Sequence, residues 1–309
     1  MALLYKSETD RADWWRQELG RRIPDLEMRV WPEIGDPAEI EYALVWNLAP
    51  GVLKTLPNLR AIFSLGAGVD HLFADPDLPR HIPVCRVVDR YLTQRMTEYV
   101  ALHVLRYHRR QPEFDELQRA ETWDELYSPT AEERHVGIMG LGELGADAAR
   151  KLAALGFAVL GWSRSPKAIP GIESFHGEAG LAPFLARSEI LVCLLPLTPA
   201  TENILSASLF ARLPKGACLI NAARGRHLVE KDLLAALDSG RLAHATLDVF
   251  RSEPLPKGHP FWRHPRITVT PHIASITDPR TVAELVAENV ARDRRGEPLL
   301  HTVDTALGY

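Results

Sequence analysis

The glycine-rich stretch between residues 136 and 164 constrains the fold of this chain more than any other segment. Val136–Met139 is a short apolar run of β-forming residues, and Gly140–Gly145 (GLGELG) follows it at once. An alanine-rich helical segment and a second apolar run, 157–162, come next. This order of strand, glycine-rich turn, helix and strand is the context that a dinucleotide-binding fingerprint requires.

Each glycine of the turn has a physical role in that interpretation. Gly140 permits the tight turn, Gly142 lets the backbone approach a pyrophosphate, and Gly145 lets the helix pack closely against the sheet. The pyrophosphate would lie at the helix N-terminus, where Glu143 and Leu144 belong to the first turn and unpaired N–H groups favour an anion. Glycine-rich turns also occur in methyltransferases and in plain loops, but the flanking strands and helix favour nucleotide binding.

The end of the second apolar run indicates which dinucleotide is bound. A site that prefers NAD carries Asp or Glu about twenty residues after the fingerprint, where it binds the ribose 2′-hydroxyl. This chain instead has Ser163, Arg164 and Ser165. Arg164 can bind a 2′-phosphate by charge-assisted hydrogen bonds, and Ser163 can add a donor. We therefore predict NADPH as the preferred cofactor, with NADH possible; the alternative is that Arg164 is a solvated loop residue.

Length and composition limit the other possibilities. The 309 residues suffice for two domains, and the formal net charge of -4 argues against nucleic-acid or anionic-membrane partners. The sequence has neither a signal-peptide pattern nor an apolar run of membrane-spanning length. Its three cysteines are far apart, which suits reduced thiols in a cytoplasmic protein. No His, Cys or Asp spacing matches a zinc site, so we predict no metal.

The first third of the chain contains a second candidate ligand site. Short apolar runs alternate with helical segments there, which predicts parallel βαβ units. A glycine-containing loop at 66–69 follows the run 61–64, at the strand end where such sheets bind ligands. Its backbone N–H groups can bind a carboxylate, although a turn that caps a helix is the alternative. Trp46 ends the neighbouring strand and can line the same site, unless it is a core residue. The loop residues concerned are Ala67, Gly68 and Val69.

Polar residues also follow three later strands of the chain. Arg224, Asp248 and His272 come just after the apolar runs 217–221, 243–247 and 267–270 respectively. The carboxyl ends of parallel strands lie at one edge of a sheet, so we expect these side chains to gather there.

The residue types in this group suit the reduction of a carbonyl. Arg224 can bind a carboxylate and polarise a carbonyl, and His272 can protonate the developing alkoxide. Glu253, in a loop held by two prolines, would stabilise the charged form of His272 and fix its tautomer. Singly, each residue has a simpler explanation as a solvated charge or a structural histidine; their common position beside a nucleotide-binding fold favours catalysis.

Five ordered motifs resemble those of the D-isomer-specific 2-hydroxyacid dehydrogenases, over essentially the whole chain. Within that family, the segments Ala43–Trp46 and Trp162–Arg164 are most similar to the bacterial glyoxylate/hydroxypyruvate reductase A group. The five motifs are Gly137–Gly145 (GIMGLGELG), Leu195–Thr201 (LPLTPAT), Asn221–Gly225 (NAARG), Leu247–Pro256 (LDVFRSEPLP) and Thr270–Ala274 (TPHIA).

The resemblance implies an α/β fold with two doubly wound parallel-sheet domains and a cleft between them. A flavodoxin-like substrate-binding domain would comprise 1–95 with 275–309, and a Rossmann NAD(P)-binding domain would comprise 96–274. The family is usually homodimeric. The implied reaction is NADPH-dependent reduction of a small 2-oxo acid, glyoxylate or hydroxypyruvate, by hydride transfer.

The resemblance also assigns roles residue by residue. His272 would be the proton donor, Glu253 its partner, and Arg224 the residue that orients the 2-oxo acid; Asp248 would line the nicotinamide end of the cofactor site. Two alternatives stay open, a bulkier 2-oxo acid such as phenylpyruvate, or a non-catalytic dinucleotide-sensing protein of the same fold. The implied cofactor-binding residues are Gly140, Gly142, Glu143, Leu144, Gly145, Ser163, Arg164, Ser165, Leu195, Pro196, Thr201, Ala222, Ala223, Arg224 and Asp248. The implied substrate-binding residues are Trp46, Ala67, Gly68, Val69, Arg224 and His272.

Overall fold

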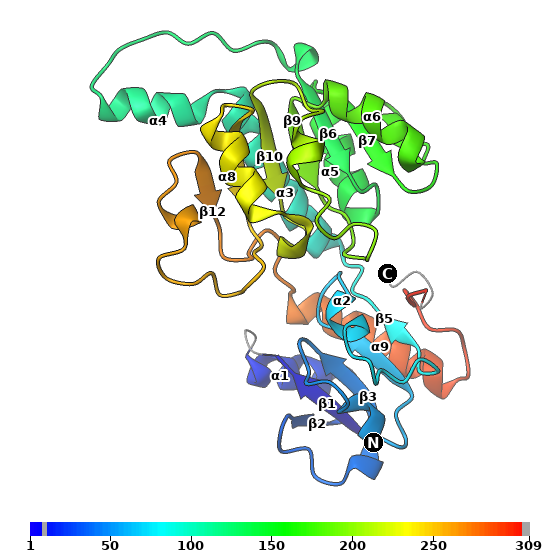
Figure 1. The fold of residues 1–309 in the computed structure, drawn as a ribbon. Helices are drawn as coiled ribbons and strands as arrows, with labels where there is room; N and C mark the ends of the chain where they lie inside the picture. The colour runs from blue at the N-terminus through cyan, green and yellow to red at the C-terminus, as the bar shows by residue number, and fades with distance from the viewer. Residues whose placement is uncertain (8–10, 305–309) are drawn as a thin grey trace. The chain divides into compact units, whose positions relative to one another are not determined.

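The chain divides into two compact units, each built on one parallel sheet (Figure 1). The computed structural model describes residues 1–7 and 11–304. The first unit comprises 1–92 with 277–309, and the second comprises 93–276. The predicted fold class, two α/β domains with parallel sheets, is confirmed. The sequence analysis placed the boundary between the two domains after residue 95. That residue lies inside one continuous helix, Arg90–His108, so no break in the helical pattern marks the boundary.

The sheet of the first unit has the strand order β2-β1-β3-β4-β5, with every pair parallel. This is the flavodoxin-like order of a doubly wound sheet. Strand β4 is buried at every position, as expected for a parallel sheet covered on both faces. The strands are β1 (Ala2–Lys6), β2 (Glu27–Val30), β3 (Ile40–Val45), β4 (Ala61–Ser64) and β5 (Val84–Cys85).

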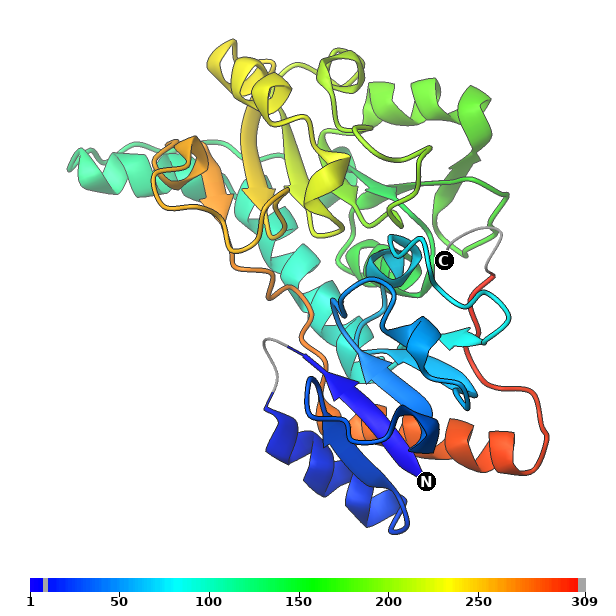
Figure 2. The same ribbon diagram turned by 60° about the horizontal axis from the view of Figure 1, so that its bottom comes forward.

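The helices of the first unit come from both ends of the sequence. They are α1 (Ala12–Arg22), α2 (Asp70–Phe73) and α9 (Pro279–Arg294), with short 3-10 turns at Pro37–Glu39 and Leu53–Thr55. Helices α1 and α9 pack side by side (Figure 2). Arg22 joins them, because its guanidinium donates to Arg280 O at 2.9 Å and to Glu284 at 3.1 Å. The last helix of the chain is therefore part of the first unit.

The second unit has the strand order β12-β11-β10-β9-β6-β7-β8, again all parallel. This is the Rossmann order with one further strand, and the order reverses between β6 and β9. The strands are β6 (His135–Met139), β7 (Ala158–Ser163), β8 (Glu173–His176), β9 (Ile190–Cys193), β10 (Ala217–Asn221), β11 (Leu242–Leu247) and β12 (Ile267–Val269). The helices are α3 (Arg90–His108), α4 (Gln111–Arg119), α5 (Glu143–Ala154), α6 (Gly177–Arg187), α7 (Ala207–Phe210) and α8 (Glu230–Asp238). Short 3-10 turns lie at Ala131–Glu133, Gly225–His227 and Pro260–Trp262.

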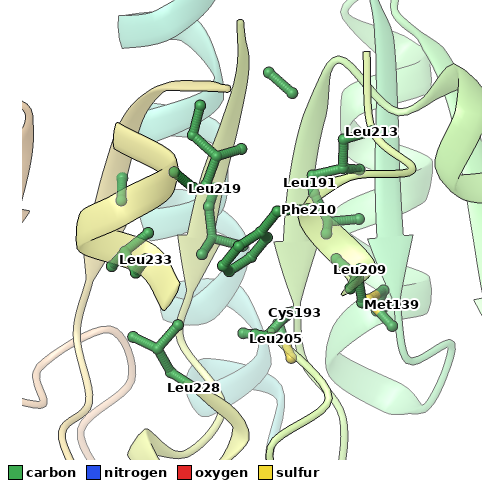
Figure 3. Close-up of a cluster of buried hydrophobic side chains, with 14 of the residues drawn as sticks. Met139, Leu191, Cys193, Leu205, Leu209, Phe210, Leu213, Leu219, Leu228 and Leu233 are labelled. Carbon is green, nitrogen blue, oxygen red and sulfur yellow. The ribbon is translucent and has the colours of Figure 1, made fainter. Parts of the chain in front are cut away.

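A large apolar cluster packs against the central strands of this sheet. Phe210 and Leu213 pack against Leu191 and Leu219 of the central strands (Figure 3), and all four are buried. The three cysteines, in β5, β9 and β10, are buried free thiols. Burial raises the pKa of each to about 12, so they are held as unreactive thiols.

The segment around α4, in contrast to the rest of the second unit, is not buried. Helix α4 buries no residue, and it reaches out with the following segment from the rest of the second unit (Figure 1). Trp123 in that segment is 97% exposed and Tyr127 is 78% exposed. Trp123 therefore does not pack within its own chain. No helix in the described ranges is both long and apolar enough to cross a membrane.

Two glycines of the fingerprint differ in how much space surrounds their Cα atoms. A Cβ added at Gly145 would lie 1.8 Å from Gly140 O, so only glycine permits the close packing of α5 on the turn. A Cβ added at Gly142 would meet no atom within 4 Å. Gly142 also has φ -76°, which any residue can adopt. The fold therefore requires glycine at 145 but not at 142.

We expect Gly145→Ala to lower the free energy of unfolding by about 1–3 kcal/mol, because the new methyl group overpacks a backbone contact. The matched control is Gly142→Ala in the same turn, which should change the free energy by less than about 0.5 kcal/mol. Urea unfolding of both variants measures the difference. Equal destabilisation would show that the turn has no such asymmetry.

Candidate active site

Most of the predicted site residues lie at one edge of the second unit's sheet. The fingerprint follows β6, Ser163 ends β7, and the loop from Leu195 follows β9. Arg224, Asp248 and His272 follow β10, β11 and β12. Because all these strands are parallel, these positions share the carboxyl edge of the sheet, where such folds bind ligands.

His272 and Glu253 form a direct pair at this edge. The Nδ1 atom of His272 lies 2.7 Å from Glu253 Oε2, and both side chains are 35% exposed. The other carboxylate oxygen, Oε1, accepts the N–H of Phe250 at 2.8 Å, which fixes the orientation of the carboxylate. Since Nδ1 faces the carboxylate, Nε2 is the ring nitrogen that can exchange a proton with a substrate.

The electrostatic surroundings keep Glu253 ionised. Burial alone raises the pKa of this carboxyl, but the hydrogen bonds from His272 and the Phe250 N–H act against it, as do the charges of His272 and Arg224. Their combined effect places the pKa of Glu253 below its ordinary value. At neutral pH an ionised carboxylate therefore faces Nδ1 of His272 and fixes the orientation of the imidazole ring.

Asp248 holds the loop that carries His272. Its side chain is 1% exposed. The Oδ1 atom accepts from Thr270 Oγ1 at 2.6 Å and from Ile273 N at 2.9 Å, while Oδ2 accepts from Ala274 N at 2.8 Å. The backbone oxygen of Asp248 accepts the N–H of His272 at 2.8 Å. The sequence did not indicate this positioning role; contact of Asp248 with the nicotinamide stays a prediction.

These contacts hold His272 in an uncommon backbone conformation. Its φ is +54°, in the left-handed region that few residues other than glycine adopt, although His, Asn and Asp are found there more often than most. Such a conformation costs about 1–3 kcal/mol and persists only when the surrounding contacts determine it. The hydrogen bonds to Asp248 are the contacts that hold His272 in this conformation.

The loop of Arg224 is shaped by two buried polar residues that the sequence did not single out. Asn221 accepts from Ala223 N at 3.2 Å and donates to Arg224 O at 3.1 Å. His227 accepts the N–H of Arg224 on Nδ1 at 3.2 Å, and its Nε2 lies 3.3 Å from Pro196 O. Nδ1 of His227 also lies 3.2 Å from Arg224 O, so the ring contacts both the N–H and the carbonyl of Arg224. Asn221 and His227 are fully buried, so burial together with these bonds is the signal that identifies them.

Close backbone packing brings the loops of Arg224 and Glu253 together. A Cβ added at Gly225 would lie 1.9 Å from the carbonyl carbon of Phe250. Only glycine permits this approach, and it explains why the charge of Arg224 acts on the pKa of Glu253. Ala222 and Ala223 are buried beside Arg224, whose guanidinium donates to Ala223 O at 2.7 Å.

The glycine-rich turn fits a dinucleotide. Gly140 has φ +103° and lies against the Leu194 carbonyl, where a Cβ would be 2.7 Å from its oxygen. Gly142 is exposed and is the N-cap residue of α5, a helix of 12 residues. Glu143 is exposed and Leu144 is half-buried in the first turn. The open space at Gly142 and the N–H groups of this turn suit a pyrophosphate.

Ser163, Arg164 and Ser165 lie at and just after the end of β7. Ser163 is buried, and its hydroxyl donates to Ser165 O at 2.8 Å. Its single proton is therefore used within the loop, and a contact of Ser163 with a 2′-phosphate stays a prediction. Arg164 and Ser165 are exposed, which leaves Arg164 as the residue suited to a 2′-phosphate.

The loop after β9 is held by Thr201. Its hydroxyl donates to Pro196 O at 2.7 Å and accepts from Thr198 N at 2.9 Å. Leu195 is buried and Pro196 is half-buried at the start of the loop. Thr201 thus shapes the loop through Pro196 O, the oxygen that His227 also contacts.

The loop 66–69 in the first unit presents unused backbone donors. Within the described ranges, the N–H groups of Ala67, Gly68 and Val69 donate no hydrogen bond. The neighbouring carbonyls are occupied, since Gly66 O accepts from Val87 N at 3.1 Å and Val69 O accepts from Leu72 N at 2.9 Å. Three successive N–H groups of this kind form a site for an anion. The loop also caps α2, so the two interpretations of the sequence are compatible.

Trp46 stands against this loop. Its ring centroid is 4.3 Å from that of His71, and a Cβ added at Gly66 would lie 2.8 Å from the indole. The side chain is only half-buried, so it is not a core residue. As for metals, the described part of the chain holds no cluster of three or more His, Cys, Asp or Glu residues that could bind an ion.

Comparison with known proteins agrees with this geometry. Residues 101–274 match the family model described as "D-isomer specific 2-hydroxyacid dehydrogenase, NAD binding domain". The chain is 44% identical to glyoxylate/hydroxypyruvate reductase A of Serratia proteamaculans, with 100% of both chains covered.

Two solved structures are also similar over the whole chain. One is a D-isomer specific 2-hydroxyacid dehydrogenase from Xanthobacter autotrophicus in complex with NADPH and MES, 47% identical with a TM-score of 0.95, covering 100% of this chain and 99% of that one. The other is an NADPH-dependent glyoxylate/hydroxypyruvate reductase from Sinorhizobium meliloti in complex with NADP and sulfate, 42% identical with a TM-score of 0.93 and the same coverage. The sequence motifs, the two parallel sheets and these full-length similarities establish that the chain belongs to the D-isomer-specific 2-hydroxyacid dehydrogenase family.

Proposed function

We propose that the protein reduces glyoxylate and hydroxypyruvate to the corresponding 2-hydroxy acids with NADPH. The observation that carries this proposal is the His272–Glu253 pair, 2.7 Å apart and partly exposed at the carboxyl edge of a Rossmann sheet. A dinucleotide-sensing protein would have no need of this proton-donating pair. The relatives named as glyoxylate/hydroxypyruvate reductases support the choice of substrate over a bulkier acid such as phenylpyruvate.

The cofactor would be held by residues of the second unit. The N–H groups at the start of α5 would bind the pyrophosphate, with Gly142 leaving room for it. Arg164 would bind the 2′-phosphate, which distinguishes NADPH from NADH. The nicotinamide supplies a hydride to the substrate carbonyl carbon when bound. NADH remains a possible, weaker cofactor.

The chain's own residues would bind the 2-oxo acid and deliver the proton. The N–H groups of Ala67, Gly68 and Val69 would bind its carboxylate. Arg224 would orient the acid and stabilise negative charge on the carbonyl oxygen. The Nε2 atom of His272 would give its proton to that oxygen, while Glu253 holds the ring in place through Nδ1.

Replacing His272 with Asn tests the proton donor. Asn adopts the left-handed backbone region readily, so the loop should keep its shape while the acid is lost. We expect kcat with glyoxylate to fall by about 10²–10⁴-fold and the Kd for NADPH to stay within about twofold of its original value. Steady-state kinetics and cofactor fluorescence measure the two quantities. An unchanged kcat would exclude His272 as the donor.

Replacing Arg164 with Ala tests the cofactor preference. The loss of charge-assisted hydrogen bonds should lower kcat/KM for NADPH by about 10–100-fold and leave kcat/KM for NADH nearly unchanged. The control is Arg150→Ala, an exposed arginine on α5, which should alter neither value. A variant that keeps its NADPH preference would show that Arg164 is only a solvated loop residue.

We also propose that two copies of the chain form a homodimer through the exposed aromatic segment. Besides Trp123 and Tyr127, helix α3 exposes Leu102 at 61% and Leu105 at 38% in the same unit. Exposed aromatic side chains are typical of protein interfaces, in which Trp and Tyr are enriched. A cytoplasmic location is part of the proposal as well, supported by the three buried free thiols.

The double variant Trp123→Ala, Tyr127→Ala tests the dimer. We expect it to sediment as a monomer at micromolar concentration, where the unaltered protein sediments as a dimer. The control is Trp262→Ala, which removes another tryptophan that is 51% exposed elsewhere in the second unit. A dimer that persists in the double variant would place the interface on another surface.

A further inference from the structure

The hydroxyl of Ser64 is fully used by the loop that follows β4. Ser64 ends that strand and is 1% exposed. Its Oγ donates to Gly68 O at 3.0 Å, accepts from Gly66 N at 3.2 Å, and lies 3.2 Å from His71 Nε2. A serine hydroxyl has one proton and two lone pairs. With the proton on Gly68 O, both lone pairs accept, so the His71 tautomer in this contact is the one protonated on Nε2.

These bonds fix the loop at the residue before the three unused donors and at the middle one of the three. Gly66 precedes Ala67, and Gly68 lies between Ala67 and Val69. Glycine backbone is conformationally permissive, so two glycines in four residues leave the loop dependent on outside contacts for its shape. Ser64 is the side chain that bonds to both glycines at once.

A second layer of side chains supports Ser64. His71 contacts its hydroxyl and packs its ring on Trp46, with the centroids 4.3 Å apart. The indole of Trp46 in turn lies where a Cβ at Gly66 would be, 2.8 Å from its nearest atom. The loop is therefore braced by hydrogen bonds from Ser64 and by the indole of Trp46.

We propose that Ser64 is a positioning residue for substrate binding, because it sets the geometry in which the N–H groups of Ala67, Gly68 and Val69 receive the carboxylate of the 2-oxo acid. This inference rests on the proposed function of the loop. Ser64 does not touch the substrate; it acts through Gly66 and Gly68. His71 orients the Ser64 hydroxyl by occupying one of its lone pairs.

The proposal predicts a selective kinetic effect. Ser64→Ala removes the shared hydroxyl but creates no large cavity, so the unit should still fold. The three N–H groups would then lose their fixed geometry, and KM for glyoxylate should rise by about fivefold to tenfold, the effect of about one hydrogen bond. The value of kcat and the Kd for NADPH should each change by less than about twofold, because the proton donor and the cofactor-binding turn are untouched.

A buried serine in the second unit supplies the matched control. Ser188 is 0% exposed, and its hydroxyl donates to Phe184 O at 2.8 Å. Ser188→Ala removes a buried, bonded hydroxyl of the same kind away from the proposed site. It should leave KM for glyoxylate unchanged, whatever its effect on thermal stability. A second variant, His71→Phe, keeps an aromatic ring for Trp46 but removes the donor to Ser64, and should raise KM by about twofold to threefold.

The experiment measures KM and kcat for glyoxylate, the Kd for NADPH, and the Kd of the NADPH-loaded protein for oxamate, a carboxylate analogue that needs no turnover. A selective rise in KM and in the oxamate Kd for Ser64→Ala, but not for Ser188→Ala, supports the proposal. Equal values in the two variants, or a proportional loss of NADPH binding, would overturn it. If the unaltered protein binds oxamate but reduces no 2-oxo acid, the proposed function fails, while the oxamate comparison still decides the role of Ser64.

Discussion

The buried carboxylate of Asp248 is the contact on which the arrangement of the active site depends. It accepts three hydrogen bonds from residues 270–274, and its own backbone oxygen accepts the N–H of His272. These bonds hold His272 at a positive φ and aim Nδ1 at Glu253, which leaves Nε2 to face a substrate. Asp248 is itself fixed because it directly follows β11, an interior strand that pairs in parallel with β10 and β12. The position of His272 therefore depends on the register in which β10, β11 and β12 pair.

Most strands that build this edge were predictable because they are predominantly apolar. The run Ala217–Asn221 was expected at the bounds that the structure has, as was Ala61–Ser64 in the first unit. Strand β8 (Glu173–His176) gave no comparable signal, since it is a polar edge strand with no buried residue. Helix α6 was also missed, and it contains Pro183, which normally interrupts a helical pattern. A strand that is buried along its whole length can be predicted from its apolar sequence. A polar edge strand cannot, because it forms only through pairing with its neighbour.

The candidate catalytic side chains were predictable by residue type, but the residues that hold them were not. Arg224, Glu253 and His272 stand out by their chemistry at strand ends, and the structure pairs the last two directly. Asn221 and His227 have no such signal, because a buried polar residue is recognised only once its partners are known. The same holds for the hydroxyl of Ser163, which donates to a carbonyl two residues away. Local hydrogen bonds of this kind follow from the path of the loop, which the sequence does not specify.

The central claim is that these residues form an NADPH-dependent reductase of small 2-oxo acids. The most direct test is kcat/KM of the purified protein for glyoxylate, hydroxypyruvate, pyruvate and phenylpyruvate, each with NADPH and with NADH. The account predicts the highest values for glyoxylate and hydroxypyruvate with NADPH, and lower values for phenylpyruvate and for NADH. A higher value for phenylpyruvate would contradict the assigned substrate class. No turnover of any of the four acids, despite NADPH binding, would contradict the reductase function itself.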